Sequence, residues 1–525
     1  MRDFQLPGRS AIHAANGICA TSHPLAAKVA VSVLEAGGNA VDAAIAGAVL
    51  LGICEPQMTG IGGDCFVLLT PPGAARVIAL NGSGRAPAGL SAASMRVAGH
   101  RTVPLRGVES VTVPGAVDAF CRLSADWGKR DLAEVLAPAI RYAEEGVPVA
   151  PRVAFDWQEG PEILQGAARA AYLLGGGVPR VGQMFRAPGQ AEVLRRIARD
   201  GRAGFYEGAV AEDMVASLRA LGGTHTLADF AAVDCTYGDS VSGTYAGLEV
   251  LEHPPNGQGV TAILILNILS HFDIAALDPF GPLRAHIEAE ATKLAHDARD
   301  RIIGDANRTT RLAHMLAPET AARLAALIDP KRALPVSRPA VGAVHKDTVY
   351  ISVVDKDRMA VSLIYSIFWA FGAGLASEKF GILFQNRGAG FTLDAGHPNE
   401  AAGGKRPMHT IIPGMLRENG TLRGPFGVMG GGYQPTGHAR FVSNLTDFGM
   451  DVQAAIDAPR SFLRGDMLEV ERGYPDVVKQ ALTDMGHVVT VPDQPLGGAQ
   501  AILIEAHGGL VAGSDPRKDG CALGY

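Results

Sequence analysis

The sequence predicts a large mixed fold of α-helices and β-strands, of the α/β (α+β) class. Two observations lead to this expectation: apolar residues recur at helical spacing over much of 115–330, and two β-branched runs follow each other from Thr348 onward. The 525 residues are 47% hydrophobic and 19% charged, which is ordinary globular composition. A chain of this length allows two to four domains, although enzymes with one large core also reach it.

The N-terminal part predicts two consecutive helices. Residues 25–36 (LAAKVAVSVLEA) place apolar groups at helical spacing, and two glycines then end that helix. Asn39 is a favourable N-cap, with Asp42 three residues further on, for a second helix that runs to about Leu51. This second segment is apolar but too short to cross a bilayer, so it reads as a core helix.

A glycine-rich loop, GIGGD at 60–64, comes before a short apolar run from Phe66 to Leu69. The run predicts a buried strand. The loop lacks the GK[ST] ending of a phosphate-binding loop, so we interpret it as close packing of backbone near the active site.

The middle of the chain predicts helices in succession, interrupted by a Pro-Pro-Asn-Gly break at 254–257 before another helix at about Val260–Phe272. The strongest helical segments are AEVLAPAIRYAEEG, QAEVLRRIARD, AEDMVASLRALGG and IEAEATKLAHDARDRIIG. Residues 330–347 contain three prolines and little periodicity, which is typical of a loosely ordered connector.

Regular structure resumes at Thr348. The run TVYISVVD predicts a strand, DKDR a turn, and MAVSLIYSIF a returning strand. A flexible connector that leads directly into a well-formed strand is the local pattern that a self-cleaving chain requires.

The bulk charge excludes several functions. The net charge is −6 and no strongly basic run appears, so we expect neither nucleic acid nor an anionic membrane surface as a partner. His253, His296 and Asp297 lack metal-ligand spacing, and we expect no metal ion and no cofactor.

The six cysteines are widely spaced without a CxxC pair, as in a reducing compartment: Cys19, Cys54, Cys65, Cys121, Cys235 and Cys521. The first residues, MRDFQLPGRSAIHAANG, lack an apolar signal-peptide core, so we expect a cytoplasmic protein.

Thr348 is a candidate nucleophile for a chemical reason. A threonine hydroxyl reacts poorly at neutral pH, but at the start of a chain its own α-amine, with a pKa of about 8, can serve as the base. A threonine at a strand start is common, so this pattern alone does not establish the role.

Eight segments, in order, resemble the gamma-glutamyltransferase family of N-terminal-nucleophile hydrolases, from about Ala20 to Tyr525. They are GGNAVDAAIAGAVLLGICEPQMTGIGGD, SVTVPGAVDAF, HPPNGQG, DTVYISVVDKDRMAVSL, FGAGL, GILFQNRG, KRPMHTIIP and GSDPRKDGCALGY. The family's fold would be a four-layer αββα sandwich, with two central, mostly antiparallel sheets covered by helices.

The resemblance implies roles for five residues. Cleavage would fall between Asp347 and Thr348, and Thr348 would become the nucleophile at the start of the new chain. Ser366, on the returning strand, matches a hydroxyl residue that hydrogen-bonds this nucleophile. Gly430 and Gly431, in VMGGG, match the pair whose backbone N–H groups form the oxyanion hole.

The sequence also departs from the family's glutamyl-binding pattern. Ser83 stands where the family has the carboxylate-binding Arg, and Arg85 is shifted by two residues. Phe368 replaces an Asn after the second strand, and we expect it to line the pocket. His409 and Thr410 replace a serine pair and are expected to contact substrate.

The most informative departure lies in GILFQNRGAGF. Gly390 aligns with the Asp that would pair with a substrate ammonium, whereas Arg387 introduces a guanidinium in place of a Gln. A buried ammonium without a counter-charge is costly, and a guanidinium favours a carboxylate. These segments look like the branch of the family that contains oxamate amidohydrolase, so we expect a small carboxylate-bearing amide as substrate.

The resemblance therefore implies a large fragment, 1–347, and a small fragment, 348–525, that stay together as a heterodimer; further dimerisation stays open. Two other hypotheses remain. The protein could be a gamma-glutamyl hydrolase or transpeptidase acting on glutathione-type donors, or an uncleaved relative without catalytic activity.

Overall fold

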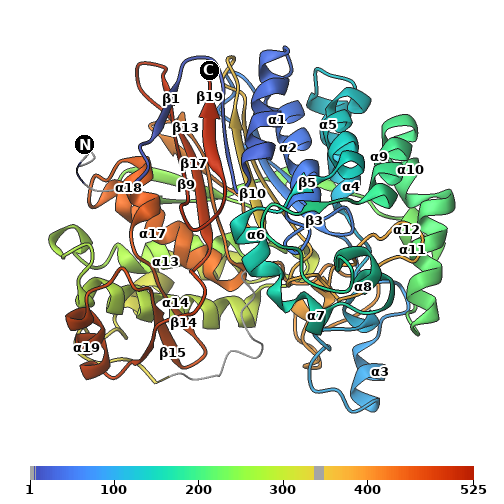
Figure 1. The fold of residues 1–525 in the computed structure, drawn as a ribbon. Helices are drawn as coiled ribbons and strands as arrows, with labels where there is room; N and C mark the ends of the chain where they lie inside the picture. Colours follow the sequence, from blue (N-terminus) through green and yellow to red (C-terminus); the bar gives the residue numbers. More distant parts are fainter. Residues whose placement is uncertain (1–4, 6–7, 336–347) are drawn as a thin grey trace.

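Two seven-stranded β-sheets lie face to face at the centre of the computed structural model, which describes residues 5, 8–335 and 348–525 (Figure 1). Helices cover the outer face of each sheet. Every strand pairing within the two sheets is antiparallel. The predicted four-layer αββα sandwich is thus confirmed.

The first sheet, called sheet 1, contains the two strands predicted after Thr348 at its centre. Its order is β19-β2-β10-β11-β3-β4-β7. The strands are β19 (Cys521–Gly524), β2 (Ile18–Thr21), β10 (Val349–Val354), β11 (Ala360–Ser366), β3 (Asp64–Thr70), β4 (Ile78–Gly82) and β7 (Thr236–Asp239).

The second sheet, called sheet 2, has the order β1-β18-β17-β13-β12-β9-β8. Its strands are β1 (Ile12–Ala14), β18 (Leu510–Ser514), β17 (Gly498–Ile504), β13 (Thr421–Met429), β12 (Gly414–Glu418), β9 (Leu248–Glu252) and β8 (Val241–Tyr245). Two smaller sheets lie outside these two. One pairs β5 (Val147–Pro148) with β6 (Met184–Phe185), and the other contains β14 (Ser461–Arg464), β15 (Met467–Val470) and β16 (Val488–Thr490).

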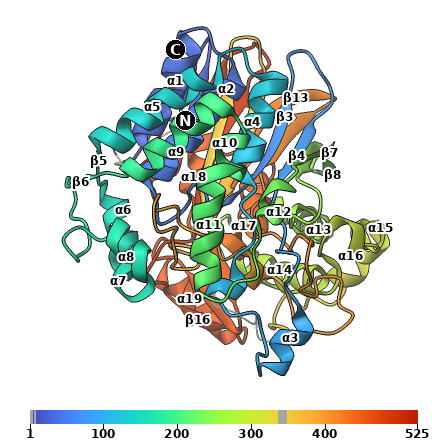
Figure 2. The same cartoon turned by 90° about the vertical axis from the view of Figure 1, so that its right-hand side faces the viewer.

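Three helices lie directly on sheet 1, and further helices pack behind them, as the turned view shows for α9 and α11 (Figure 2). The direct layer is α1 (Pro24–Glu35), α2 (Ala40–Cys54) and α4 (Ala116–Trp127). Behind it lie α5 (Leu132–Glu145), α9 (Pro188–Asp200), α10 (Ala203–Tyr206), α11 (Gly208–Ala220) and α12 (Leu227–Ala231). The short helices α6 (Pro151–Asp156), α7 (Gly160–Ile163) and α8 (Gly166–Tyr172) contribute to the same apolar cluster. The short α3 (Ala92–Val97) belongs to a separate small cluster.

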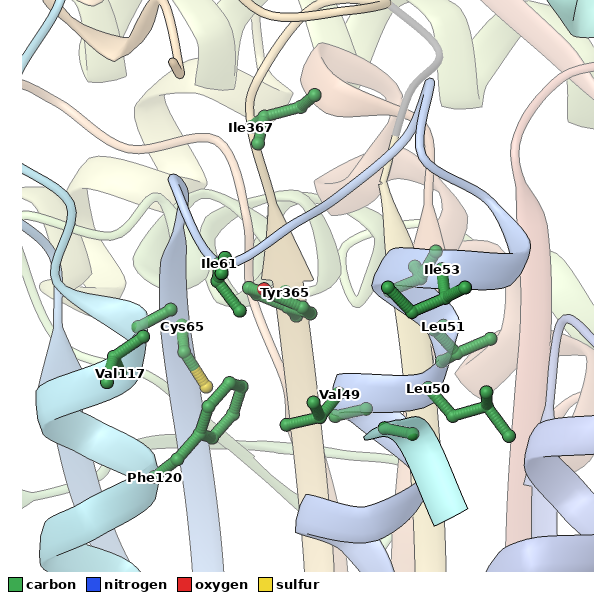
Figure 3. Packing of buried hydrophobic residues seen from close by; sticks show 14 of the residues in the cluster. Val49, Leu50, Leu51, Ile53, Ile61, Cys65, Val117, Phe120, Tyr365 and Ile367 are labelled. Carbon is green, nitrogen blue, oxygen red and sulfur yellow. The ribbon is translucent and has the colours of Figure 1, made fainter. Parts of the chain in front are cut away.

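Helix α2 is buried along its whole length, which explains why its sequence is apolar on every side. The capping box is formed as predicted, because Asn39 accepts from the N–H of Asp42 while Asp42 accepts from the N–H of Asn39. The helix ends at Cys54, three residues later than predicted. Figure 3 shows its Val49 in one packed layer with Phe120 of α4 and Tyr365 of β11.

The opposite outer layer covers sheet 2 with α13 (Gly259–Leu269), α17 (Gln434–Thr446) and α18 (Val452–Asp457). Next to them lie α14 (Pro282–Ile302), α15 (Leu312–Leu316) and α16 (Pro318–Ala325). The strands β14–β16 and α19 (Asp476–Asp484) pack against α14. Within the described residues, no helix is both long enough and apolar enough to cross a bilayer.

The facing sides of the two sheets form their own apolar layer. Along β10, Val349, Ile351 and Val353 face the α1/α2 layer, whereas Tyr350 and Val354 face sheet 2. This alternation is what a strand buried on both faces requires. Because Tyr350 clusters with Met429, the last residue of β13, that end of β13 lies beside the start of β10.

Most predicted elements are confirmed. The strands at Phe66–Leu69 and after Thr348 appear as β3, β10 and β11, and the helical middle appears as α4–α16. The helical reading missed β7, β8 and β9, which lie between α12 and α13. The predicted connector at 330–347 falls largely outside the described residues.

Candidate active site

Thr348 lies at one end of the central strands of sheet 1 and is fully buried. Its neighbour Val349 pairs with Tyr365 across β10 and β11, so Thr348 stands at the level of Ser366. Ser366 in turn pairs with Asp64 on β3. The three side chains therefore form one row across adjacent strands, while Asp347 lies outside the described residues.

The glycine-rich loop before β3 allows this row to form. A Cβ atom on Gly63 would lie 2.4 Å from the carbonyl oxygen of Ser366, and one on Gly62 would lie 2.0 Å from that of Leu383. Real Cβ atoms cannot approach backbone so closely, so glycine is needed at both positions. The predicted role of this loop in close packing is confirmed.

Ser366 is oriented by two N–H donors. Its Oγ accepts from the backbone N–H of Phe368 at 2.9 Å and from Nη2 of Arg387 at 3.5 Å. Phe368 has a φ of 81°, which is rare for a bulky side chain and marks local strain. The turn after β11 therefore holds a strained residue whose N–H fixes the Ser366 hydroxyl.

Arg387 begins a short 3₁₀ turn at Arg387–Gly390 and is fully buried. Its Nη1 donates to Oγ1 of Thr410 at 3.0 Å, and its guanidinium carbon lies 4.0 Å from the centre of the Phe368 ring, which allows a cation–π contact. Burial lowers the pKa of Arg387 to about 9, against the opposing effect of the Asp64 charge. The side chain is still a cation at neutral pH.

The oxyanion candidates follow directly on β13. Gly430 has a φ of 128° and Gly431 a φ of 57°, values that favour glycine. The carbonyl of Gly431 accepts from Nε2 of Gln258 at 2.9 Å, and the same Nε2 donates to the carbonyl of Thr410 at 2.6 Å. Gln258 thus connects the glycine pair to the Arg387 side of the site.

His409 contacts a carboxylate. Its Nε2 lies 3.0 Å from Oδ2 of Asp64, and its Nδ1 accepts from the N–H of Ile411 at 3.4 Å. Burial, then the charge of Arg387, lowers the pKa of His409 to about 3 against the opposing effects of Asp64, so its ring is neutral at neutral pH. Both ring nitrogens are therefore occupied by protein groups.

Asp64 has three further partners. Its Oδ1 accepts from the N–H of Gly84 at 2.9 Å, from the N–H of Gly115 at 3.1 Å and from Nε2 of Gln385 at 2.8 Å. Burial raises the pKa of Asp64, but the hydrogen bond from His409 and the Arg387 charge outweigh it, so that the pKa lies below its usual range. Asp64 is an anion at neutral pH.

The sequence reading missed Asp64 and Gln258 as parts of the site. Asp64 had one usable signal, because a lone acid at the start of an otherwise apolar strand must find buried partners. The shifted Arg85 points away from the site, toward the carbonyl of Gly404 and, at 3.7 Å, toward Asp305.

The arrangement brings together a buried hydroxyl at a strand start, a second oriented hydroxyl, a buried cation and two glycines with unusual backbone angles. Such groups can supply a nucleophile, a carboxylate anchor and oxyanion donors.

Comparisons with known proteins agree with this geometry. The family model for gamma-glutamyltranspeptidase matches residues 26–525. The chain belongs to this family. It is therefore a hydrolase that acts on carbon–nitrogen amide bonds, as the sequence predicted.

Two curated relatives cover nearly the whole chain. The glutathione hydrolase-like YwrD proenzyme of Bacillus subtilis is 36% identical over 96% of this chain and 97% of its own length. The oxamate amidohydrolase proenzyme of Klebsiella pneumoniae is 35% identical over 97% and 98%. Among solved structures, cephalosporin acylase from Bacillus halodurans superimposes with a TM-score of 0.92 at 38% identity, covering 100% of this chain and 99% of the acylase.

Proposed function

We propose that this chain cleaves itself before Thr348 and then hydrolyses the amide bond of a small carboxylate-bearing substrate through an acyl-Thr348 intermediate. The observation that carries the substrate class is the buried guanidinium of Arg387 beside Ser366. Both relatives named as proenzymes support the self-cleavage.

In self-cleavage, Oγ of Thr348 attacks the carbonyl carbon of Asp347, and the peptide nitrogen becomes the free α-amine of Thr348. Water then hydrolyses the resulting ester and releases the carboxylate of Asp347. The α-amine is now on the same residue as the hydroxyl, where it can accept the hydroxyl proton.

In turnover, Oγ of Thr348 attacks the substrate amide while the α-amine takes its proton. The same proton passes to the leaving nitrogen, which departs as ammonia or an amine, and water hydrolyses the acyl ester. Ser366 supports this step because two N–H donors fill the acceptor positions of its Oγ, so that its own O–H acts as a donor.

Gly430 and Gly431 are the proposed oxyanion donors. A Cβ on Gly430 would lie 3.0 Å from Cα of Gly497, and the φ of 128° at Gly430 would also strain any other residue. Glycine therefore lets the backbone N–H groups approach a reacting carbonyl, where such donors stabilise the charge of the transition state.

Arg387 is the proposed carboxylate anchor. Within the described residues its guanidinium donates only to the hydroxyls of Thr410 and Ser366, and its Nε has no hydrogen-bond partner. A guanidinium has five N–H donors, and a buried one is stabilised by an anion that accepts two of them. A substrate carboxylate would meet that need, with Thr410 and Phe368 beside it.

Gly390 argues against a substrate ammonium at the family's usual position. A Cβ on Gly390 would lie 2.8 Å from the carbonyl oxygen of Met408, so no carboxylate side chain fits there without moving backbone. Oxamate, the substrate in one relative's name, has a carboxylate and a primary amide but no amine. A gamma-glutamyl donor stays as the second candidate because YwrD is named glutathione hydrolase-like.

His409 is better placed to hold Asp64 than to bind substrate, because its ring nitrogens already have protein partners. We therefore propose that it contributes to the pocket by positioning Asp64, whose charge faces Arg387.

The two fragments would remain associated. Strands β10 and β11, from 348–525, lie between β2 and β3, which belong to 1–347. Neither fragment alone could complete sheet 1, so we propose the heterodimer as the active form.

The substrate class is tested by measuring ammonia release from oxamate, a neutral amide of similar size and glutamine, each with wild type and Thr348→Ala. We expect release from oxamate by wild type only. Faster release from glutamine, or turnover of glutathione, would support the glutamyl candidate instead. Equal ammonia release by wild type and Thr348→Ala would show that Thr348 is not the nucleophile.

A further inference from the structure

Three buried side chains that could bind a metal ion meet on the outer side of sheet 2, apart from the Thr348 row. His286 and Glu290 lie one turn apart on α14, and His487 follows α19. One ligand atom from each lies within 4.8 Å of the others. Because the histidines are 201 residues apart, sequence spacing could not predict this cluster.

The distances fit a tetrahedral ion after small side-chain rotations. Nδ1 of His286 lies 2.7 Å from Nε2 of His487, and that Nε2 lies 3.9 Å from Oε1 of Glu290. Ligands of a tetrahedral zinc ion at about 2.0–2.1 Å are separated by about 3.4 Å. The first distance must therefore open by about 0.7 Å and the second close by about 0.5 Å, and the third, between Glu290 and His286, lies within 4.8 Å.

The surrounding groups already orient two of the ligands. Nε2 of His286 lies 2.8 Å from the carbonyl oxygen of Asp329, so this nitrogen carries the hydrogen and Nδ1 is directed at His487. Such a carbonyl partner is the usual outer contact of a metal-binding histidine. Oε2 of Glu290 accepts from the N–H of Leu334 at 2.9 Å, which holds the carboxylate.

Lys293 has two opposing effects on metal binding by this cluster. Its Nζ lies 2.6 Å from Oε1 of Glu290 and 2.8 Å from the carbonyl oxygen of Leu334. These contacts hold the Glu290 side chain in place, while the ammonium charge weakens the attraction for a cation. We therefore expect the affinity of this cluster for a metal ion to be lower than that of a similar cluster without a neighbouring ammonium group.

We propose that His286, Glu290 and His487 bind one zinc ion. Two imidazoles and one carboxylate are a set that zinc accepts, with a fourth position left for water. In this geometry Nε2 of His487 donates its hydrogen to Nδ1 of His286, so zinc binding would require His487 to carry that hydrogen on its own Nδ1 instead, with no net loss of a proton from the pair.

The ion would have a structural role. If the chain is cleaved as proposed above, His286 and Glu290 belong to the large fragment and His487 to the small one. The zinc ion would then join the fragments at a point where Ala333 also donates to the carbonyl of Met485. Binding itself does not depend on cleavage.

The test uses tag-free Thr348→Ala protein, so that every sample is one uncleaved chain, after treatment with a chelator. Cobalt(II) is titrated as a spectroscopic substitute for zinc, and metal content is measured after dialysis against zinc. We expect one equivalent of metal, the strong visible absorption of tetrahedral cobalt, and its loss on adding zinc. His487→Gln and Glu290→Gln should each weaken uptake at least tenfold, whereas His507→Gln, at an exposed histidine, should not.

Two results would overturn the proposal. One is a protein that shows only the weak spectrum of hydrated cobalt and takes up no zinc. The other is equal uptake by the parent protein and by folded His487→Gln and Glu290→Gln variants. Should a variant fail to fold, as judged by circular dichroism, the cobalt spectrum of the parent protein alone decides. Because every sample is uncleaved Thr348→Ala protein, the outcome is independent of cleavage and of the proposed hydrolase function.

Discussion

Nε2 of His409 lies 3.0 Å from Oδ2 of Asp64, and both side chains are fully buried. This contact joins the loop that leads into β12, which carries His409, to the start of β3, where Asp64 pairs with Ser366. Because Asp64 is ionised and its field reaches Arg387, the pair sets the electrostatics of the proposed carboxylate pocket.

Asp64→Asn should destabilise the fold by about 3–5 kcal/mol at neutral pH, because it leaves buried donors and the Arg387 charge without their anion. The lowered pKa of Asp64 means that its stabilisation is complete above the unfolded pKa of about 4 and is lost as the pH falls through the lower folded value. Urea unfolding in the Thr348→Ala background measures both effects.

The control is Asp239→Asn, which removes an exposed ion pair with Arg76. That change should cost less than about 1 kcal/mol. Similar effects of the two substitutions would contradict the role given to Asp64.

Arg387→Ala should lower kcat/KM for a carboxylate-bearing amide by about 30-fold or more, corresponding to about 2 kcal/mol or more for a lost buried charge contact. The effect on a neutral amide should be much smaller. Arg387→Lys keeps the charge but loses the forked geometry, so it should recover only part of the loss. Steady-state kinetics on the two substrates checks this, and equal losses on both would argue against a carboxylate at this position.

Gly390→Asp should fail to create a gamma-glutamyl enzyme. Its Cβ would meet the carbonyl oxygen of Met408 at 2.8 Å, so the backbone must shift before the carboxylate can reach a substrate. Gly390→Ala should lower oxamate turnover to a similar degree, because it has the same Cβ without the charge. Glutathione turnover that appears in Gly390→Asp but not in Gly390→Ala would contradict this prediction, because it would show that the wild-type pocket lacks only a carboxylate to accept a gamma-glutamyl donor.

Glu55 should make the stability of the folded protein fall as the pH rises, opposite to the effect of Asp64. Burial raises its pKa to about 7, although the charge of Lys518 and the hydrogen bond from Ser22 at 2.5 Å oppose this. A raised carboxyl pKa means that stability falls as the pH rises from about 4.5 to about 7, here by about 3 kcal/mol.

Glu55→Gln keeps a hydrogen-bond acceptor for Ser22 but cannot ionise. The difference in unfolding free energy between this variant and its parent should therefore change by about 3 kcal/mol across that pH range. A difference that stays constant would mean that Glu55 does not titrate there.

Local signals in the sequence were enough for the elements that frame the nucleophile. The Asn39 capping box and the β-branched runs of β10 and β11 are each decided by residues a few positions apart. The same is true of the glycines of loop 60–64, whose spacing already indicated close backbone packing.

Other features depend on contacts between distant segments. Asp64 and His409 are 345 residues apart, and neither residue type indicates its partner. Strands β7–β9 were missed because they are short, because β7 and β8 are partly exposed, and because Gly238 in β7 and Gly243 in β8 weaken a strand pattern. Pairing with β4 and β12 stabilises them, and that pairing is visible only in the folded chain.

Thr348 should become the first residue of a new chain. N-terminal sequencing of the purified protein after incubation tests this, with Thr348→Ala as the parallel sample. We expect two N-termini in wild type, one of them reading Thr-Val-Tyr-Ile-Ser, and only the original N-terminus in Thr348→Ala. A wild-type protein that hydrolyses amides while uncut, or is cut at another bond, would contradict it.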